Sequence, residues 1–360
     1  MSSWLIYRGT GEPHDGIAGL APPPPWRTFH GGPVLPIPPE ADGSAHSRLG
    51  DLRIASSYRP DPSAVELVNA ALQLRRPLLV TGKPGTGKSS LAYSVAYELG
   101  LGPVLRWPIT SKSALPEGLY SYDALGRLQD VNLSGGDRGA AGGPGVTGPR
   151  IDWDDSGDGE HDRAVTGQDS SIGDYVRLGP LGTALLPFSQ PRVLLIDEID
   201  KSDVDLPNDL LNLFEYPAYR LPELARIAER SPEVAVLTED GNRVTVQNGE
   251  VMCHAFPFVL LTSNGEREFP PAFLRRCLRL ELAMPSPEQL AGIVESHLGP
   301  ELAAESQDLL DAFVNRRRDG DLAADQLLNA VYLTSFAARE HGDDRTRLAQ
   351  LLMRHLDRPA

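Results

Sequence analysis

A glycine-rich loop between a strand-like run and a helix-like stretch constrains this chain more than any other feature. The loop is Gly82-Lys83-Pro84-Gly85-Thr86-Gly87-Lys88-Ser89, with the apolar run 78–80 before it and the stretch 90–99 after it. This is the pattern of a P-loop in its required context of strand, loop and helix. The glycines let backbone N–H groups turn toward phosphate oxygens, and the helix N-terminus adds positive partial charge. The sequence therefore predicts a nucleotide-binding α/β domain.

The side chains of this loop have distinct expected roles. Lys88 is expected to reach the β- and γ-phosphates of ATP, and the Ser89 hydroxyl is expected to bind Mg²⁺. The other positions assigned to nucleotide binding are Gly82, Lys83, Pro84, Gly85, Thr86, Gly87 and Ser90. A chance glycine-rich turn is the alternative, and the flanking strand and helix signals argue against it.

Paired carboxylates follow a second strand-like run. The apolar residues 193–196 end in Asp197 and Glu198, and ligands of parallel-sheet folds bind at the C-terminal edge of the sheet. We expect Asp197 to hold Mg²⁺ or its water, and Glu198 to orient and polarise the attacking water. An exposed acidic turn after a core strand is the competing interpretation.

A third strand-like run, 258–261, is followed by Thr262, Ser263 and Asn264. The amide of Asn264 is expected at the same sheet edge, within reach of the water or the γ-phosphate, although Ser-Asn after a strand is by itself typical of a turn. Further along the chain, Arg275 and Arg276 stand side by side. Paired arginines at a helix end commonly cap carbonyls or face solvent, but a guanidinium supplied by a neighbouring subunit could act as an arginine finger.

Strand and helix signals alternate from about residue 63 to residue 285, which predicts a parallel sheet with helices on both faces. Before them, nine prolines within the first 40 residues predict polyproline II or an extended arm. After residue 286 the apolar positions follow a helical period, which predicts a small all-α domain. The expected organisation is an arm at 1–50, a P-loop ATPase core at 51–285 and a helical lid at 286–360.

A Gly- and Asp-rich insert at about 134–174 interrupts the core. Residues 151–174 contain eight Asp or Glu and one Arg, which places −7 of the net charge of −15 in this segment. The segment 152–163 has Asp at positions 1, 3 and 7 of an EF-hand loop, but Arg163 stands where a bidentate Glu is needed. We therefore expect a disordered, solvated insert rather than a calcium site, with a partner-docking loop as an alternative.

Charge and cysteine content exclude several classes of protein. A net charge of −15 disfavours nucleic-acid binding by bulk electrostatics, which needs clustered Lys and Arg. Cys253 and Cys277 form neither a disulfide framework nor a zinc pattern, so both are expected to be buried thiols. No apolar stretch approaches 18 residues, and the one near the N-terminus is too short for a signal peptide. A cytoplasmic protein without membrane contact is therefore expected.

Together these motifs resemble the AAA+ ATPases, and within them the MoxR-like branch. The resemblance covers about residues 52–340 and lies in GKPGTGKS (82–89), LLIDEID (194–200), LLTSN (260–264) and FPPAFLRRC (269–277), in the order of Walker A, Walker B, sensor 1 and arginine finger. Segment 119–125 looks like part of this branch's insert, and 244–251 looks like part of its hairpin. The resemblance implies a ring hexamer with ATP at subunit interfaces, in which Arg276, or else Arg275, is the finger.

One position departs from the MoxR-like pattern. Lids of this branch carry a sensor 2 arginine, whereas the matching segment here is Ala323-Ala324-Asp325-Gln326. Gln326 cannot supply the charge of a guanidinium, which puts the coupling of the lid to the γ-phosphate in question. The leader at 4–29 and the segment 178–183 resemble the corresponding parts of MoxR-type ATPases from bacterial multi-gene systems. These systems also contain von Willebrand A-type or protease-like partner proteins.

The motifs and the resemblance lead to one main expectation and two alternatives. The main expectation is a Mg²⁺-dependent ATPase that assembles into a homo-oligomeric ring, expected to be a hexamer, and uses hydrolysis to remodel an unidentified partner protein. A slow, ATP-loaded switch within a larger complex is one alternative, because the sensor 2 arginine is missing. A nucleic-acid-dependent AAA+ motor is the other, and the net acidity disfavours it.

Overall fold

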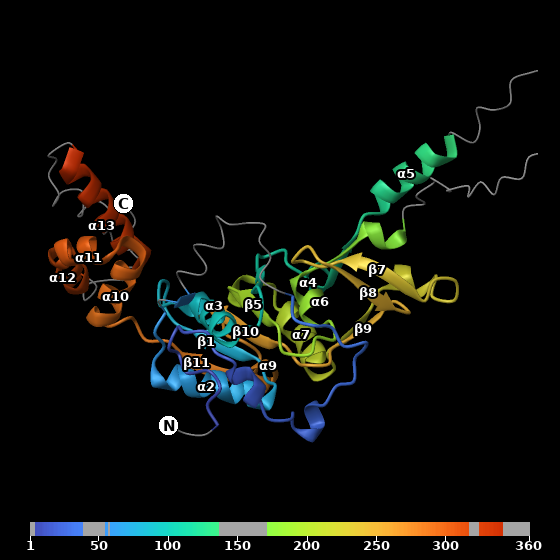
Figure 1. Ribbon diagram of the computed structural model, residues 1–360, viewed down its shortest axis with the longest axis horizontal. Helices are drawn as coiled ribbons and strands as arrows, with labels where there is room; N and C mark the ends of the chain where they lie inside the picture. Colours follow the sequence, from blue (N-terminus) through green and yellow to red (C-terminus); the bar gives the residue numbers. More distant parts are fainter. Residues whose placement is uncertain (1–3, 39–54, 57, 137–170, 317–323, 341–360) are drawn as a thin grey trace, which may run out of the picture.

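The computed structural model describes residues 4–38, 55–56, 58–136, 171–316 and 324–340. Within them, a five-stranded parallel sheet in the order β11-β1-β10-β5-β2 forms the centre of the molecule (Figure 1). The strands are β1 (Leu78–Thr81), β2 (Leu105–Pro108), β5 (Val193–Asp197), β10 (Phe258–Ser263) and β11 (Leu278–Glu281). Because the strands are parallel, their C-terminal ends share one edge of the sheet, where folds of this kind bind ligands.

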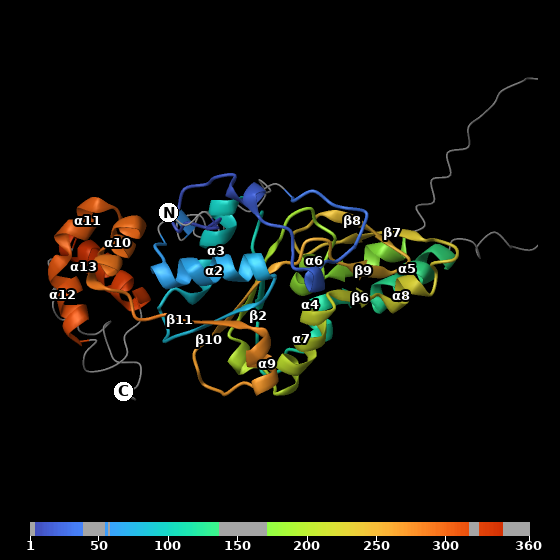
Figure 2. The same cartoon turned by 90° about the horizontal axis from the view of Figure 1, so that it is seen from below.

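Helices cover both faces of this sheet, because successive strand residues point to opposite sides. Leu78 and Val80 of β1 pack in one apolar cluster with residues of α2 (Pro62–Leu74) and α3 (Lys88–Leu99). Leu79 of the same strand packs in another cluster, with residues of α6 (Pro180–Ala184), α7 (Asp205–Glu215) and α9 (Pro271–Arg276). Figure 2 shows α2 and α3 on one side of the sheet and α7 and α9 on the other. The predicted α/β class, a parallel sheet with helices on both faces, is confirmed.

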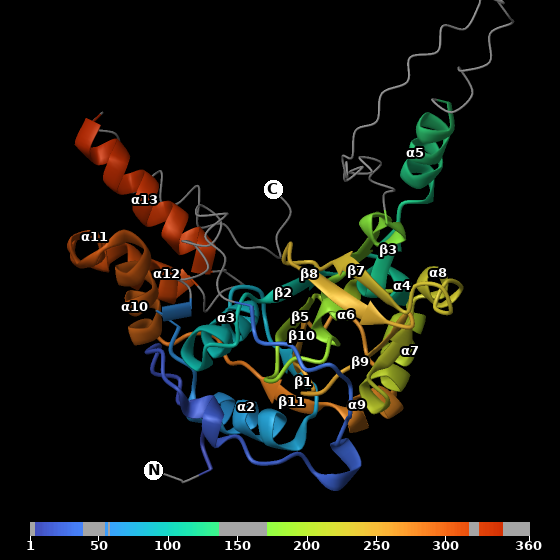
Figure 3. The ribbon, with the colours of Figure 1, turned by 45° about the vertical axis from the view of Figure 1, so that its right-hand side comes forward.

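A second sheet, which we did not predict as a unit, lies at the end of the molecule opposite the lid helices (Figure 3). Among the described residues it contains β3 (Tyr120–Tyr122), β4 (Val176–Leu178), β7 (Glu233–Leu237), β8 (Arg243–Gln247), β9 (Glu250–Met252) and β6 (Ala218–Arg220), in that order. The hairpin expected at 244–251 is formed by β8 and β9. Its turn residues Asn248 and Gly249 both have positive φ, at 54° and 67°, as a two-residue hairpin turn requires.

Helical segments connect these strands and border the predicted insert. They are α4 (Leu115–Leu119), α5 (Ala124–Gly136), η3 (Ile172–Tyr175), η4 (Ile199–Lys201) and α8 (Pro222–Ala225). The insert expected at about 134–174 is ordered at both ends, because residues 134–136 extend α5 and Ile172 is buried in η3. Residues 137–170, including the EF-hand-like segment 152–163, lie outside the described residues.

The helices after residue 286 form a small all-α unit, as predicted. They are α10 (Pro287–Leu298), α11 (Pro300–Glu305), α12 (Gln307–Arg316) and α13 (Ala324–Glu340). Their apolar side chains form a core of their own, made of Leu290, Val294, Leu309, Leu310, Phe313, Leu327, Ala330 and Val331. A capping box starts α10, in which Ser286 Oγ accepts from the N–H of Gln289 at 3.2 Å and Gln289 Oε1 accepts from the N–H of Ser286 at 2.8 Å. The capping box therefore defines the start of α10, which follows β11 after the connecting residues 282–286.

The proline-rich arm packs on the core instead of extending away from it. Its 3-10 turns are η1 (Gly16–Gly19) and η2 (Pro25–Arg27). Tyr7 is fully buried, and its hydroxyl lies 2.8 Å from Ser94 Oγ of α3. Arg27 is also buried and donates to the carbonyl of Phe214 at 2.5 Å. Within the described residues 4–38, buried polar side chains thus hold the arm against the core at Tyr7 and Arg27.

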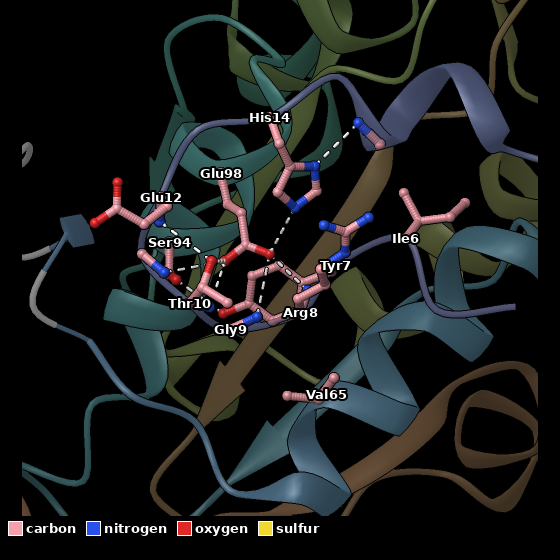
Figure 4. A network of polar contacts seen from close by, with 12 residues as sticks. Ile6, Tyr7, Arg8, Gly9, Thr10, Glu12, His14, Val65, Ser94 and Glu98 are labelled. Atoms are coloured by element: carbon pink, nitrogen blue, oxygen red, sulfur yellow. Dashed lines mark hydrogen bonds and ion pairs between the residues drawn. The ribbon is translucent and has the colours of Figure 1, made fainter. Parts of the chain in front are cut away.

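Glu98, near the C-terminal end of α3, anchors the first part of the arm (Figure 4). Its buried carboxylate accepts hydrogen bonds of 2.5 to 3.1 Å from the backbone N–H groups of Arg8, Gly9, Thr10 and Gly11. A buried carboxylate is stable only where donors replace its water shell, and here the backbone of the arm supplies them. One side chain therefore joins the arm to the helix that follows the P-loop.

Both cysteines are buried free thiols, as predicted. Burial raises the pKa of Cys253 and of Cys277 to about 12, so each stays protonated at neutral pH. In the part of the chain that the structure describes, no helix has the length and apolar character needed to cross a membrane.

Replacing Glu98 with Ala is expected to loosen the arm. The substitution removes the acceptor of four N–H groups, of which that of Gly11 is buried, at about 1–3 kcal/mol for an N–H that water does not reach, and we expect a loss of about 3 kcal/mol in the free energy of unfolding. Urea unfolding measures this loss, and trypsin should cleave after Arg8 more rapidly. The control is Glu66→Ala, which removes an exposed carboxylate from α2. Equal stability of the two variants would contradict the anchoring role of Glu98.

Candidate nucleotide-binding site

The loop between β1 and α3 has a backbone that only glycine adopts easily. Gly82, Gly85 and Gly87 have φ values of 154°, 77° and 83°, in the left-handed region that disfavours side chains. A Cβ atom on Gly82 would lie 2.7 Å from the carbonyl oxygen of Leu282, and one on Gly87 would lie 2.8 Å from the ring of Tyr58. The predicted P-loop therefore has the local conformation that its glycines imply.

Lys88 is the first residue of α3, and its side chain folds back over the loop. Its ammonium group donates to the carbonyls of Gly82 and Lys83 at 2.8 Å and 2.9 Å. Burial lowers the pKa of Lys88, while the nearby carboxylates, Asp200 foremost among them, act in the opposite direction. The hydroxyl of Thr86 donates to the same Lys83 carbonyl at 2.9 Å. The loop thus surrounds a buried cation where the phosphates of a nucleotide are expected.

Asp197, the last residue of β5, accepts hydrogen bonds from several elements. Its Oδ1 accepts from the hydroxyls of Ser89 and Thr262, each at 2.8 Å. Its Oδ2 accepts from Nη2 and Nε of Arg106 at 2.7 Å and 3.2 Å. Burial by itself raises the pKa of Asp197, but the hydrogen bonds from Arg106, Ser89 and Thr262 outweigh burial and lower it. Asp197 is therefore ionised at neutral pH.

The donor set around Asp197 fits Mg²⁺. The hydroxyl of Ser89 donates its hydrogen to Asp197, so the lone pairs of the Ser89 oxygen can bind a cation. A hydroxyl oxygen together with a carboxylate oxygen is the type of ligand set that Mg²⁺ prefers. Among the described residues, no group of three or more His, Cys, Asp or Glu side chains could hold a metal ion. Few protein ligands suit Mg²⁺, because it keeps several waters and takes phosphate oxygens as ligands.

Glu198 has an unusual backbone conformation for a non-glycine residue, with φ at 62°. Its N–H donates to Thr262 Oγ1 at 2.8 Å, and its carboxylate pairs with the ammonium group of Lys201 at 2.7 Å. About four-tenths of each of these two paired side chains is exposed. Left-handed non-glycine residues concentrate at functional sites, where the surrounding structure maintains the strain. The turn after β5 therefore holds Glu198 at the border of the site.

Asn264, directly after β10, is positioned by Asp200, the last residue of the 194–200 motif, to which the sequence assigned no role. Its N–H donates to Oδ2 of Asp200 at 2.9 Å, and the N–H of Glu266 donates to the same oxygen at 3.1 Å. Asp200 is 4% exposed, and its Oδ1 has no hydrogen-bond partner within the described structure. The segments that follow β5 and β10 are thus joined by one buried carboxylate.

These side chains line one cleft of about 750 Å³ between the sheet edge and the lid, a size suited to a small organic ligand. The core side of the cleft includes Tyr58, Arg59, Asp61, Pro84 to Ser90, Arg106, Asp197, Glu198, Thr262 and Asn264; the lid side includes Glu288, Gln289, Gly292, Ile293, His297 and Leu328. Gly82 and Lys83 do not line the cleft, but their carbonyl groups accept hydrogen bonds from the ammonium group of Lys88. The cleft thus brings together the predicted loop residues, both carboxylates and Asn264.

The paired arginines do not join this cleft. Arg276, at the end of α9, pairs with Glu215 of α7 at 2.7 Å and is partly exposed. Arg275 is exposed, and its carbonyl accepts a hydrogen bond from Arg76. Neither side chain is among those that line the cleft of its own chain. A role for either in the site would therefore require a second copy of the chain.

No role was assigned from the sequence to Arg106, Thr262 or Asp200, although Thr262 and Asp200 lie within the motif segments 260–264 and 194–200. Asp200 lies three residues after Asp197, and Thr262 lies two residues before Asn264, so each could have been suspected from its neighbour in the sequence. Arg106 is the single charged residue in the strand-like segment 103–109, which was a weaker signal. Only the pairing of β2 with β5 places Arg106 beside Asp197.

No family model matches this chain, and no curated protein matches it. Among solved structures, it is similar to the structure of C. elegans PCH-2, with 14% sequence identity and a TM-score of 0.39, over 85% of this chain and 70% of that chain. A likeness at this level says nothing about chemistry.

Thr262→Val is expected to destabilise the protein by about 2 kcal/mol. The substitution removes the hydroxyl that donates to Asp197 and accepts from the N–H of Glu198. Thr262 is fully buried, so water cannot take the place of the hydroxyl. Thr262→Ser keeps the hydroxyl and is the matched control, with an expected cost of about 1 kcal/mol for the lost methyl group. Urea unfolding compares the two variants. A Val variant as stable as the Ser variant would show that these hydrogen bonds do not hold the site together.

Proposed function

We propose that this chain is a Mg²⁺-dependent ATPase. The observation that carries the proposal is the cleft, in which Lys88, the Ser89–Asp197 pair, Glu198 and Asn264 meet at the C-terminal edge of one parallel sheet. Hydrolysis of a nucleoside triphosphate needs a phosphate cradle, a metal site and a group that activates water. Each of these has a candidate within the same cavity.

The position of each side chain supports a separate task. Lys88 and the N–H groups of the loop bind the β- and γ-phosphates. Glu198 orients a water molecule and accepts its proton, while Asn264 hydrogen-bonds to that water or to the γ-phosphate. Mg²⁺, when held by Ser89 and Asp197, supplies positive charge that offsets the charge on the phosphates. His297 and Leu328 of the lid cover the nucleotide and limit the entry of water.

We further propose that the chain acts as a homo-oligomeric, MoxR-like ring that remodels a partner protein. The order of its motifs supports this, as does the position of Arg275 and Arg276 outside the cleft of their own chain. The second sheet and α5 extend from the end of the core opposite the lid, and so offer a surface for a partner (Figure 3). A protein partner is favoured over nucleic acid by the net charge of −15.

A slow, ATP-loaded switch is the second candidate, and the lid favours it. Within the described residues, the lid side of the cleft contains no Lys or Arg, so the lid brings no permanent cation to the phosphates. A switch of this kind would bind ATP tightly and turn over negligibly even in the complete assembly. Steady-state turnover of the assembled protein, with and without its partner, separates the two functions.

Glu198→Gln is expected to keep ATP binding and to lower kcat on the order of 100-fold or more, because the amide cannot accept the proton of water. Phosphate release measures turnover, and equilibrium binding of a fluorescent ATP analogue measures affinity. Glu229→Gln, an exposed position away from the cleft, is the matched control. Turnover of the Glu198 variant at the parent rate would exclude Glu198 as the activating group.

Arg276→Ala is expected to abolish most turnover in the assembly while ATP binding persists, because the finger acts on the neighbouring site. Mixing this variant with Glu198→Gln tests the arrangement directly. Some sites in the mixture combine an intact Glu198 with an intact Arg276 from the next subunit, so activity should partly return. The same experiment with Arg275→Ala decides which arginine is the finger. No recovery in either mixture would contradict a shared site.

A further inference from the structure

Arg106 occupies a position that the motifs of the site do not explain. It lies on β2, the strand next to β5 in the sheet, and its register partner is Leu195. The side chains of Leu105 and Trp107 are buried in the core, whereas Arg106 is exposed, as the alternation of a strand requires. The guanidinium reaches along the strand toward the C-terminal edge of the sheet, where it meets Asp197.

The contact with Asp197 leaves Arg106 at the phosphate end of the cleft. A guanidinium has five N–H donors in a rigid fork, and Nε and Nη2 both donate to the same oxygen of Asp197. The other oxygen of Asp197 accepts from Ser89, next to Lys88. Arg106 therefore lies beside the residues expected to hold the metal and the terminal phosphates. Its side chain is 55% exposed and lines the cleft.

The cations of the cleft point to the same role. Among the described residues that line it, the permanently charged cations are Arg59, Lys88 and Arg106, all from the core. Arg59 donates to the carbonyls of Ser56 and Tyr58, in its own segment of the chain. Lys88 belongs to the P-loop. Apart from Lys88 of the P-loop, Arg106 is thus the described cation of the core that lies at the Asp197 end of the cleft.

We propose that Arg106 binds the terminal phosphate of a nucleoside triphosphate in its own subunit while it remains paired with Asp197. This inference rests on the proposed function, because it requires that the cleft bind a triphosphate. A guanidinium fork can serve a carboxylate and a phosphate together, which a lysine ammonium does less well. Arg106, which lies on the sheet, then supplies the positively charged contact to the terminal phosphate within its own subunit. The lid has Gln326 at the position where an arginine would make this contact.

The consequence is a preference for ATP over ADP that depends on Arg106. The contact exists only with the γ-phosphate, so its loss weakens ATP binding and leaves ADP binding nearly unchanged. A charge-assisted hydrogen bond of this kind corresponds to about tenfold or more in affinity. If Arg106 acted only by ordering Asp197 and the metal, its removal would matter only when Mg²⁺ is present.

The experiment measures the dissociation constants of ATP and ADP for the full chain, both with Mg²⁺ and with EDTA in its place. For Arg106→Gln we expect ATP affinity to fall about tenfold in both conditions, with ADP affinity changed by less than about threefold. Arg106→Lys keeps the charge without the fork, so its loss of ATP affinity should be smaller. This second variant retains the ion pair with Asp197 and keeps the test valid if the Gln variant does not fold.

The matched control is Arg177→Gln. Arg177 lies on β4 of the second sheet, pairs with Glu239, and is also 55% exposed, so this variant removes an equally exposed, paired guanidinium far from the cleft. Its ATP and ADP affinities should equal those of the parent chain.

Each remaining outcome would overturn the assignment. An unchanged ratio of ATP to ADP affinity in both Arg106 variants would show that Arg106 does not contact the γ-phosphate. A loss confined to Mg²⁺-containing buffer would make Arg106 a positioning residue for Asp197. A parent chain that binds neither nucleotide, with Lys88→Ala identical to it, would instead refute the proposed function itself, a result distinct from failure of Arg106 alone.

Discussion

A buried carboxylate at the C-terminal edge of the sheet is the constraint on which the rest of the site depends. Asp197 accepts hydrogen bonds from Ser89 at the start of α3, from Thr262 at the end of β10 and from Arg106 of β2. An ionised carboxylate with so little exposure is costly unless donors surround it. The strands must therefore end at matching levels for the donors to converge. The P-loop helix is attached to the neighbouring strands through the same carboxylate.

Hydrogen bonds to carboxylates fix the helix α3 at both ends: the helix donates at one end and accepts at the other. At its N-terminal end, Ser89 donates to a carboxylate from another strand. At its C-terminal end, its own Glu98 accepts from the backbone of the arm. Tyr7 of the arm packs in one apolar cluster with residues of this helix, and its hydroxyl lies beside Ser94. The arm is therefore part of the framework that holds the P-loop in place, although its composition suggested a separate, extended segment.

The features predictable from sequence were those encoded within a few consecutive residues. The glycines of the loop, the apolar run before Asp197 and the helical period after residue 286 each predict local structure, and the parallel sheet follows from the alternation of strand and helix signals. Arg106 and Thr262 were missed because their importance depends on the register of β2 and β10 against β5. The second sheet was missed for a similar reason, since it joins short strands from residues 120 to 252. Asp200 acts on the loop after β10, 64 residues further along.

Several charges at the Asp197 end of the cleft are already paired before any nucleotide binds. Asp197 pairs with Arg106 and Glu198 pairs with Lys201, while Asp200 lies close enough to Lys88 to affect its pKa. Under the proposed function, a triphosphate brings several negative charges to this end of the cleft, where Arg106 and Lys201 are already paired with carboxylates. Repulsion between like charges at short range in a partly buried site is strong, so positive charge from outside the chain's own side chains would favour binding of the triphosphate. Mg²⁺ is one source, and an arginine from a neighbouring copy is the other. The charge balance of a single chain therefore gives a physical reason for nucleotide binding and assembly to be coupled.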